Sequence, residues 1–288
     1  MASIIDLPDF MFNYSNKKYN KVSKIFYTFF GLIIGLIHRR AFGKIFCNSM
    51  NLFFNKDGKI FYEEDMYYKK IWTGHKFFYP NKRIDRLIIN HKKHFDLLFN
   101  TYCLDELSFK KNEIVIDCGA NVGELFISLI QNNAECNYIA FEPDPITFKS
   151  LERNLINYGI KIHDCALSDE NKNKDLYLDT DGADTSLIYF GSDRKVNVNV
   201  KTLDSFNIKG VKLLKIEAEG AELEVLEGAK ETLKYTEYVT VDYGPERGIS
   251  KLSTSAEIVN FLYENNFKLI KVSKFRQVGL FKKSSIKS

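Results

Sequence analysis

One short stretch constrains the fold more than any other part of the chain: residues 114–124, which read IVIDCGANVGE. An apolar run ends in an acid, a turn with two glycines follows, and a helical apolar pattern begins at Leu125. This order predicts a buried parallel strand, a tight turn and the N-terminus of a helix. Ligands of open α/β sheets bind at such a turn, beyond the carboxyl end of the strand.

The spacing within this turn distinguishes it from two other nucleotide-binding loops. Gly119 and Gly123 let the backbone approach a ligand without a Cβ atom in the way. Asn121 occupies the second glycine position of the dinucleotide motif G-x-G-x-x-G, and no Gly-Lys-Ser/Thr follows as in a P-loop. The turn therefore does not predict a pyrophosphate site, and the acid Asp117 suits a cationic or hydroxyl-rich ligand.

Strand-like and helix-like segments alternate from residue 112 onward. We expect strands at 114–118, 137–142, 160–165, 212–217 and 238–242, helices at 122–133, 221–233 and 254–263, and a final antiparallel pair at 268–272 and 278–281. Alternating patches at 176–178 and 196–200 fit an edge hairpin. The alternation indicates a doubly wound, mostly parallel α/β sheet with a C-terminal antiparallel strand.

The front of the chain differs in charge from the rest. Residues 1–112 carry 19 Lys/Arg and 10 Asp/Glu, whereas residues 113–288 carry 22 and 27. A basic front half indicates an anionic surface or substrate, and a solvated lysine-rich surface explains it equally well. We divide the chain into a basic, aromatic-rich, helical and mixed extension, residues 1–75, and a main domain, residues 76–288. Short strands are expected at 59–62 and 76–79, and a helix from Arg83 to Leu104.

The extension contains a largely apolar run at residues 25–37, flanked by basic residues. The run is too short to span a bilayer, which needs about 20 residues in a helix. Two interpretations stay open: a helix buried against the main domain or a second subunit of a homo-oligomer, and a peripheral membrane contact through residues 17–40. Five cysteines without a C-x-x-C pair indicate reduced thiols, so we expect a cytoplasmic protein, with membrane association as the second interpretation.

Five short motifs occur in a recognisable order: residues 115–123, 141–145, 166–169, 202–206 and 215–222. With this order and spacing, residues 76–282 resemble the FkbM family of methyltransferases. The resemblance implies a class I, Rossmann-like methyltransferase fold and S-adenosyl-L-methionine as cofactor. It also implies O-methylation of a hydroxyl group on a sugar or polyketide-type acceptor.

The predicted cofactor residues lie at or just after strand ends: Asp117, Gly119, Asn121, Gly123, Glu142 and Asp164. Asp117 would accept a hydrogen bond from the cofactor's ammonium group, directly or through water. Glu142 would bind both ribose hydroxyls, because a carboxylate offers two acceptor oxygens. Asp164 is expected near the adenine.

The predicted catalytic residues are the acids Glu217, Glu219 and Asp242, at the ends of the next two strands. An acceptor hydroxyl must lose its proton as the methyl group arrives, and a carboxylate such as Glu219 can take it. Glu217 and Asp242 offer an alternative, a Mg²⁺ site that acidifies a bound hydroxyl. The family usually has Asp at position 217, and the longer Glu puts a metal geometry in question. A purely structural role near a helix N-terminus is the third interpretation.

The sequence therefore predicts a methyltransferase that acts on a saccharide or another hydroxyl-bearing acceptor, most specifically a sugar of a glycan or glycolipid. The first rival is a nicotinamide-dependent Rossmann oxidoreductase, and the second is a non-catalytic methyltransferase-like glycan or membrane adaptor. Nucleic acid is not an expected partner, because the predicted catalytic half is net acidic.

Overall fold

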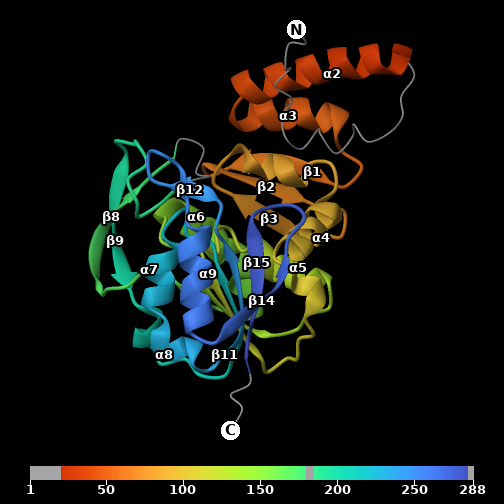
Figure 1. Ribbon diagram of the computed structural model, residues 1–288. Coiled ribbons are helices and arrows are strands. Elements are labelled where there is room, and N and C mark those ends of the chain that lie inside the picture. Colours follow the sequence, from red (N-terminus) through yellow and green to blue (C-terminus); the bar gives the residue numbers. More distant parts are fainter. Residues whose placement is uncertain (1–20, 180–184, 285–288) are drawn as a thin grey trace. The chain divides into compact units, whose positions relative to one another are not determined.

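The computed structural model describes residues 21–179 and 185–284, with side chains from Phe29 onward (Figure 1). Its internal contacts divide the chain into two compact units, Met1–His94 and Phe95–Ser288. The domain boundary expected at residue 75 stays a prediction. Lys17 and Lys18, part of the predicted membrane contact, lie outside the described residues.

The first unit is built from two helices and a small antiparallel sheet. The helices are α2 (Lys21–Arg40) and α3 (Gly43–Phe53), and the strands, in order across the sheet, are β1 (Lys59–Glu63), β2 (Met66–Lys70) and β3 (Lys76–Tyr79). The strands expected at 59–62 and 76–79 are confirmed. Strand β2 was not expected, because a lysine interrupts its apolar pattern. That residue, Lys69, is fully buried and donates to Asp57 Oδ2 at 2.9 Å and to the carbonyl of Ile88 at 3.2 Å.

The helix expected from Arg83 to Leu104 is wrong in its length. The segment forms three pieces: the 3₁₀ helix η1 (Lys82–Leu87), α4 (His91–Thr101) and the 3₁₀ turn η2 (Leu104–Glu106). Side chains bind the amides at the break: Asp57 Oδ2 accepts from the amide of His91 at 2.7 Å and Asn90 Oδ1 from the amide of Lys93 at 3.0 Å. These bonds satisfy amides of the first turn of a new helix.

The apolar run at 25–37 lies within α2. The rings of Phe30 and Phe53 meet edge to face at 5.3 Å, and those of His38 and Phe46 at 5.9 Å, so α2 packs on α3. Across the described part of the chain, every helix is too short or too polar to cross a membrane.

The second unit is organised by a seven-stranded sheet with the order β14-β15-β11-β10-β4-β5-β6. Its strands are β4 (Ile114–Cys118), β5 (Asn137–Phe141), β6 (Lys161–His163), β10 (Val211–Ile216), β11 (Thr236–Asp242), β14 (Phe267–Val272) and β15 (Val278–Lys283). All pairings are parallel except those of β15, which runs antiparallel to both β11 and β14. The predicted class, a doubly wound mostly parallel sheet with an antiparallel C-terminal strand, is confirmed.

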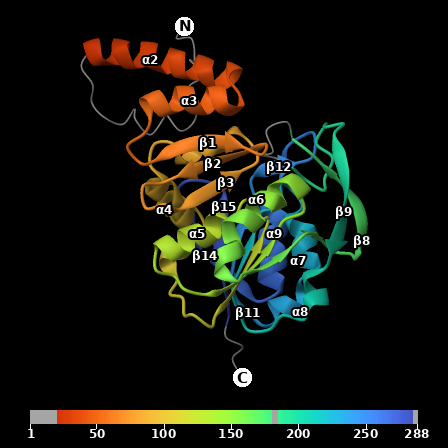
Figure 2. The ribbon, with the colours of Figure 1, turned by 180° about the vertical axis from the view of Figure 1, so that it is seen from behind.

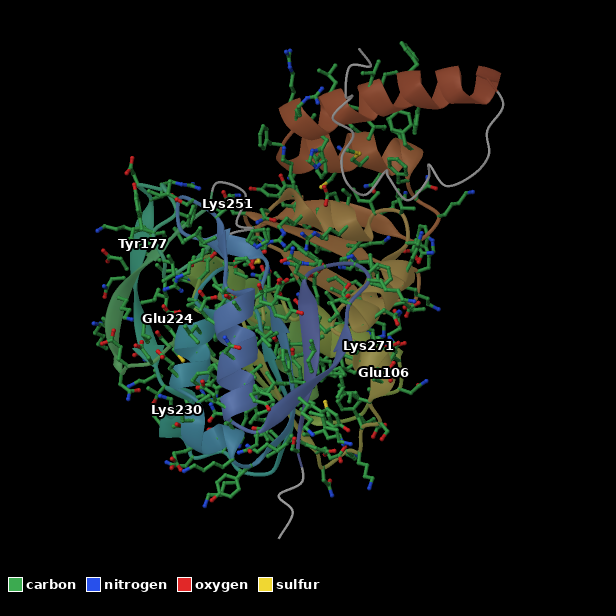
Figure 3. All side chains as sticks on the ribbon, in the orientation of Figure 1. Glu106, Tyr177, Glu224, Lys230, Lys251 and Lys271 are labelled. Atoms are coloured by element: carbon green, nitrogen blue, oxygen red, sulfur yellow. The ribbon has the colours of Figure 1, made fainter. Side chains whose placement is uncertain are left out.

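Helices cover both faces of this sheet (Figures 1 and 2). Apolar side chains of α5 (Glu124–Gln131) and α6 (Pro145–Leu155) pack on one face, and those of α7 (Glu222–Glu227), α8 (Lys230–Leu233) and α9 (Ser255–Glu264) on the other. The central strands are therefore buried on both sides, which explains their continuous apolar sequence. Lys271 of β14 binds Asp105 and Glu106 of η2 at 2.7 and 2.9 Å. Lys271 and Glu106 are labelled in Figure 3.

The helix expected over residues 221–233 is divided into α7 and α8 at Gly228. A Cβ atom at Gly228 would lie 1.9 Å from the carbonyl oxygen of Ser168, so the two backbones touch there. Asp204 binds the amides of Glu231 and Thr232 at 2.9 and 2.7 Å and starts α8. The long-range contact and the cap together break the helix.

The hairpin expected near residues 176–200 is confirmed as β8 (Lys172–Tyr177) and β9 (Lys195–Lys201). It does not extend the edge of the main sheet. It pairs instead with β7 (Ala166–Leu167) in a separate three-stranded sheet. A short pair, β12 (Pro245–Arg247) and β13 (Leu252–Ser253), follows β11.

Candidate active site

The turn after β4 is fixed between the ends of three strands. The amides of Gly119 and Ala120 donate to the carbonyl of Phe141 at 3.0 and 2.9 Å, which ties the turn to β5. On the other side, a Cβ atom at Gly119 would lie 1.9 Å from the carbonyl oxygen of Glu217. The φ angle of Gly119 is +74°, so this position requires glycine both for its conformation and for the close approach. The turn is thus held at the carboxyl edge of the sheet, where the sequence predicted it.

Glu142 follows β5 and lies directly beside this turn. Its Oε2 accepts from the amide of Asn121 at 2.8 Å, and its Oε1 accepts from the amide of Asp144 at 2.9 Å. Asn121 takes a φ of +51°, which directs its amide to the carboxylate. Burial raises the pKa of Glu142 to about 7. The carboxylate is thus fixed in direction and is close to a change of protonation at neutral pH.

Asp117 is fully buried, and both of its carboxylate oxygens have protein partners. Lys215 Nζ lies 2.9 Å from Oδ1, and the hydroxyl of Tyr138 donates to Oδ2. The same ammonium group donates to the carbonyls of Cys118 and Gly119 at 3.2 and 2.8 Å. The direct contact between Asp117 and a cofactor ammonium group is therefore not favoured in this geometry. Asp117 instead positions Lys215, which holds the backbone of the turn.

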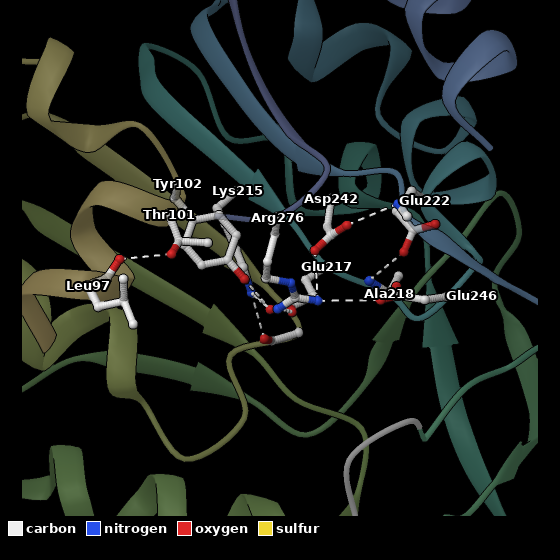
Figure 4. Close-up of polar contacts among 12 residues, drawn as sticks. Leu97, Thr101, Tyr102, Lys215, Glu217, Ala218, Glu222, Asp242, Glu246 and Arg276 are labelled. Carbon is white, nitrogen blue, oxygen red and sulfur yellow. Dashed lines mark hydrogen bonds and ion pairs between the residues drawn. The ribbon is translucent and has the colours of Figure 1, made fainter. Parts of the chain in front are cut away.

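Glu217 lies at the end of β10 within reach of two cations and a phenol. Its Oε1 accepts from Arg276 Nη1 at 2.7 Å, and its Oε2 lies 3.3 Å from Lys215 Nζ (Figure 4). The hydroxyl of Tyr102 also donates to Oε2. Burial alone would raise the pKa of this carboxyl, but the two cations outweigh it and lower the pKa to about 2. Such a carboxylate is a weak proton acceptor.

Arg276 bridges three acids that come from different strands and loops. Besides Glu217, it reaches Asp242 Oδ2 at 2.7 Å and Glu246 Oε1 at 3.3 Å (Figure 4). Asp242 is almost fully buried at the end of β11, and burial raises the pKa of its carboxyl despite Arg276. Burial and the charge of Asp242 raise the pKa of Glu246 to about 7.

The predicted Mg²⁺ site at Glu217 and Asp242 is not supported. The guanidinium of Arg276 binds both carboxylates, so a cation already occupies the place that the metal would take. Among residues 21–179 and 185–284, no group of three or more His, Cys, Asp or Glu side chains is arranged to hold a metal ion.

Glu219 lies in the loop that leads from β10 to α7. Its φ angle is +49°, and its carbonyl accepts from Ser186 Oγ at 2.7 Å. Glu222 fixes the backbone of this loop, because its Oε1 accepts from the amides of Ala218 and Gly220 at 2.9 and 3.0 Å. Arg247, the neighbour of Glu246, donates to the carbonyl of Gly220 at 2.5 Å. The loop of Glu219 is therefore in contact with β12, the strand that contains Glu246.

Asp164 follows β6 directly and is exposed, at the same carboxyl edge. The neighbouring His163 packs between two rings, stacked on Phe141 at 4.8 Å and edge to face with Phe206 at 4.8 Å. Burial lowers the pKa of His163. This agrees with a packed histidine and not with a proton carrier.

Comparison with known proteins identifies the family. A family model described as the methyltransferase FkbM domain matches residues 117–269, more than half of the chain. The chain belongs to the FkbM methyltransferase family. The match begins at Asp117, in the first strand of the sheet, and ends in β14, so the FkbM region contains the turn and all the strand-end acids described above.

Three relatives and one solved structure illustrate the similarity. The chain is 28% identical over 159 residues to Methyltransferase 1 of Beauveria bassiana, covering 46% of this chain and 64% of the relative. It is 30% identical over 174 residues to Methyltransferase sdnD of Sordaria araneosa, covering 46% and 67%. It is 24% identical over 181 residues to the 2-O-methyltransferase NoeI of Sinorhizobium fredii, covering 52% and 74%.

The solved structure is an FkbM methyltransferase from Methylobacillus flagellatus. It superposes with a TM-score of 0.45 at 17% identity and covers 66% of this chain and 50% of that one. The chain thus spans about half to three quarters of the length of these proteins.

Several residues of the candidate site were not predicted from the sequence: Tyr102, Tyr138, Lys215, Glu246 and Arg276. Lys215 carried a usable signal, because a lysine inside an apolar parallel strand needs a buried acidic partner. Arg276 and Glu246 carried none, since Arg276 lies in a polar turn and Glu246 in the short strand β12, and both segments look solvated in sequence.

Proposed function

We propose that the protein is an S-adenosyl-L-methionine-dependent O-methyltransferase that acts on a hydroxyl group of a sugar in a glycan or glycolipid. Membership of the FkbM family supports methyl transfer. The observation that carries the cofactor assignment is the buried carboxylate of Glu142, fixed beside the glycine turn by two backbone amides.

The Glu142 carboxylate suits a ribose. Its two oxygens offer about four lone-pair positions, and the two amide hydrogen bonds use two of them. The remaining two can accept from a pair of neighbouring hydroxyls, which is the group that a ribose presents. The glycine turn lies beside this carboxylate, and the exposed Asp164 lies beyond the next strand, where an adenine would be bound.

The charge of this edge favours a cationic cofactor over a dinucleotide. Six acids surround the site, and Lys215 and Arg276 already bind several of them. The acids are Asp117, Glu142, Glu217, Glu219, Asp242 and Glu246. An excess of carboxylates attracts a sulfonium and repels the pyrophosphate of a nicotinamide cofactor. The oxidoreductase alternative is therefore disfavoured.

Bound S-adenosyl-L-methionine would supply a methyl group activated by its positive sulfur. The protein's own residues must then orient the acceptor and take its hydroxyl proton. Glu246 is suited to accept this proton, because its pKa of about 7 leaves about half of it ionised at neutral pH and makes the carboxylate basic enough to act. Glu219, on the loop in contact with β12, is the second candidate. Glu217 and Asp242 hold Arg276, and we assign them to positioning.

The acceptor class rests on a relative. The 2-O-methyltransferase NoeI matches 74% of its own length to this chain, which supports oxygen as the methylated atom. The acid-rich edge suits a neutral, hydroxyl-bearing acceptor such as a sugar, whose hydroxyls can donate to carboxylates.

Calorimetric titration tests the cofactor assignment. We expect the protein to bind S-adenosyl-L-methionine and S-adenosyl-homocysteine but not NADH, and Glu142→Gln to weaken the first two by about tenfold or more. Binding of NADH alone would refute the methyltransferase proposal. Mass spectrometry of sugar acceptors incubated with the protein and the cofactor detects one added methyl group. Cofactor binding without such a group on any acceptor would favour the adaptor interpretation.

A further inference from the structure

The outer face of α2 exposes a continuous row of large apolar side chains. Phe29, Leu32, Ile33 and Leu36 are 64%, 45%, 37% and 49% exposed. Their spacing of three, four and seven residues puts them on one face of the helix. A helix on the surface of a water-soluble domain ordinarily has polar residues on this face, so the row requires a separate explanation.

The opposite face of α2 is the one that packs against the protein. Gly31, Ile34 and Gly35 are buried there, and Phe30 and His38 contact rings of α3. The helix therefore already has its intramolecular partner. The exposed row is a second apolar face, which the described part of the first unit leaves open to solvent.

The adjoining helix adds to this apolar surface. Phe42, in the connection between the helices, is 63% exposed, and Ile45 and Leu52 of α3 are 70% and 78% exposed. Phe46, Cys47 and Met50 on the other side of α3 are buried. Both helices of the hairpin thus combine one buried face with exposed large apolar side chains.

The charge of the same segment is one-sided. Residues 21–56 contain six Lys or Arg and no Asp or Glu, so the first acid after this stretch is Asp57. Arg39, Arg40 and Lys44 lie at the connection of the two helices and are exposed. Apolar side chains next to basic ones, without any acid, are the composition that binds at the interface of an anionic lipid bilayer.

We propose that the α2–α3 hairpin, residues 21–56, binds the surface of an anionic membrane. A second copy of the chain fits this surface less well. In a two-fold contact the same patch meets itself, so the exposed Arg39, Arg40 and Lys44 would approach the same basic residues of the other copy. The helix lies in the plane of the interface, because its apolar row follows one side of α2.

Co-sedimentation of the full chain with phospholipid vesicles tests this inference. We expect binding to vesicles of phosphatidylcholine with phosphatidylglycerol to be at least about tenfold tighter than to phosphatidylcholine alone, and to weaken with added salt. Leu32→Ser, Ile33→Ser and Leu36→Ser combined should reduce binding by about tenfold or more. The reversal of Arg39, Arg40 and Lys44 to Glu should abolish the preference for anionic lipid.

Matched control variants separate this surface from a general effect of charge or apolarity. Ile146→Ser, Ile156→Ser and Ile249→Ser change side chains that are 58%, 70% and 69% exposed in the second unit, and should leave vesicle binding unchanged. The control for the charge reversal changes three exposed lysines of the second unit to Glu: Lys111, Lys209 and Lys251. This variant should keep the preference for anionic lipid. Circular dichroism of each variant verifies that it is folded.

Three results would overturn the inference. The first is equal binding by the wild type and the α2 serine variant. The second is a wild-type dimer in light scattering that becomes monomeric in the serine variant without any vesicle binding, since the face would then be a subunit interface. The third is vesicle binding that appears only after deletion of residues 1–20, since that segment would then be its occupant.

Discussion

The guanidinium of Arg276 binds the carboxylate of Glu217 at 2.7 Å, although 59 residues separate them in sequence. Arg276 lies in the turn between β14 and β15, and Glu217 follows β10. The same guanidinium reaches Asp242 and Glu246. One side chain therefore balances the charge of three acids at the edge of the sheet where we place the acceptor.

Removal of this side chain should change both stability and its dependence on pH. We expect Arg276→Ala to lower the free energy of unfolding by about 1–3 kcal/mol, at the lower end because the side chain is partly exposed. The lowered pKa of Glu217 contributes stability that is present above its unfolded pKa near 4.5 and is lost as pH falls toward about 2. Without Arg276 this carboxyl protonates at higher pH. As the pH falls, the variant should therefore begin to lose stability at a higher pH than the wild type.

Urea unfolding between pH 3 and pH 7 measures this effect. Lys274→Ala, an exposed lysine of the same turn, is the control and should behave like the wild type. If the free energy of unfolding depends on pH in the same way in the Arg276 variant and in the control, the ion pair between Arg276 and Glu217 does not contribute to stability.

Cofactor binding should be coupled to release of a proton from Glu142. The free carboxyl has a pKa of about 7, and ribose hydroxyls that donate to it stabilise its ionised form. We therefore expect release of about half a proton at pH 7 and roughly tenfold weaker binding for each pH unit below it. Calorimetry in buffers of different ionisation enthalpy measures the proton count. A pH-independent affinity between pH 5 and 8 would contradict the role of Glu142.

Gly119→Ala should destabilise the protein more than an alanine at another glycine of similar conformation. Its Cβ would collide with the carbonyl of Glu217 at 1.9 Å, whereas a Cβ at Gly159, with φ of +64°, meets nothing within 4 Å. We expect a loss of about 1–2 kcal/mol for Gly159→Ala, from backbone conformation alone, and about 3 kcal/mol or more for Gly119→Ala. The urea midpoints of the two variants provide the comparison. Equal losses of unfolding free energy would show that the turn shifts to accommodate a Cβ at residue 119 at little cost.

The proton acceptor can be identified from the pH dependence of turnover. With Glu246 as base and the cofactor saturating, kcat/KM for the acceptor should rise with pH up to about 7 and then level off, because only the ionised carboxylate accepts a proton. Glu246→Gln should lower turnover about 10²–10⁴-fold, remove this rise and leave cofactor affinity near normal. Glu219→Gln tests the second candidate in the same assay. Glu227→Gln changes an exposed acid of α7 and should have no effect.

Much of the fold could be predicted because its signals are local. The strand at 114–118, the glycine turn and the antiparallel pair at the end follow from apolar periodicity and from Gly119 and Gly123. Two helices were predicted too long, because their breaks depend on distant residues. Asp57 binds the amide of His91 from 34 residues away, and Ser168 packs against the backbone of Gly228.

The site was predicted less completely than the fold. Strand-end acids such as Glu142 are visible in sequence, because the parallel strands must end at one edge. Their partners are not visible, because Lys215 and Arg276 reach them through space. The Mg²⁺ alternative is unsupported for this reason: two carboxylates were recognised without the guanidinium that lies between them.

The reversed direction of β15 has a consequence for reach. Because β15 runs against β11, the turn before it opens at the edge where the parallel strands end, and Arg276 is delivered there. A parallel strand of the same six residues would begin at the opposite edge, roughly 20 Å away, beyond the length of any side chain. Because this one strand is antiparallel, a turn near the C-terminus contributes Arg276 to the site. The sequence of the turn between β14 and β15 can change without a change in the strands that position Glu142.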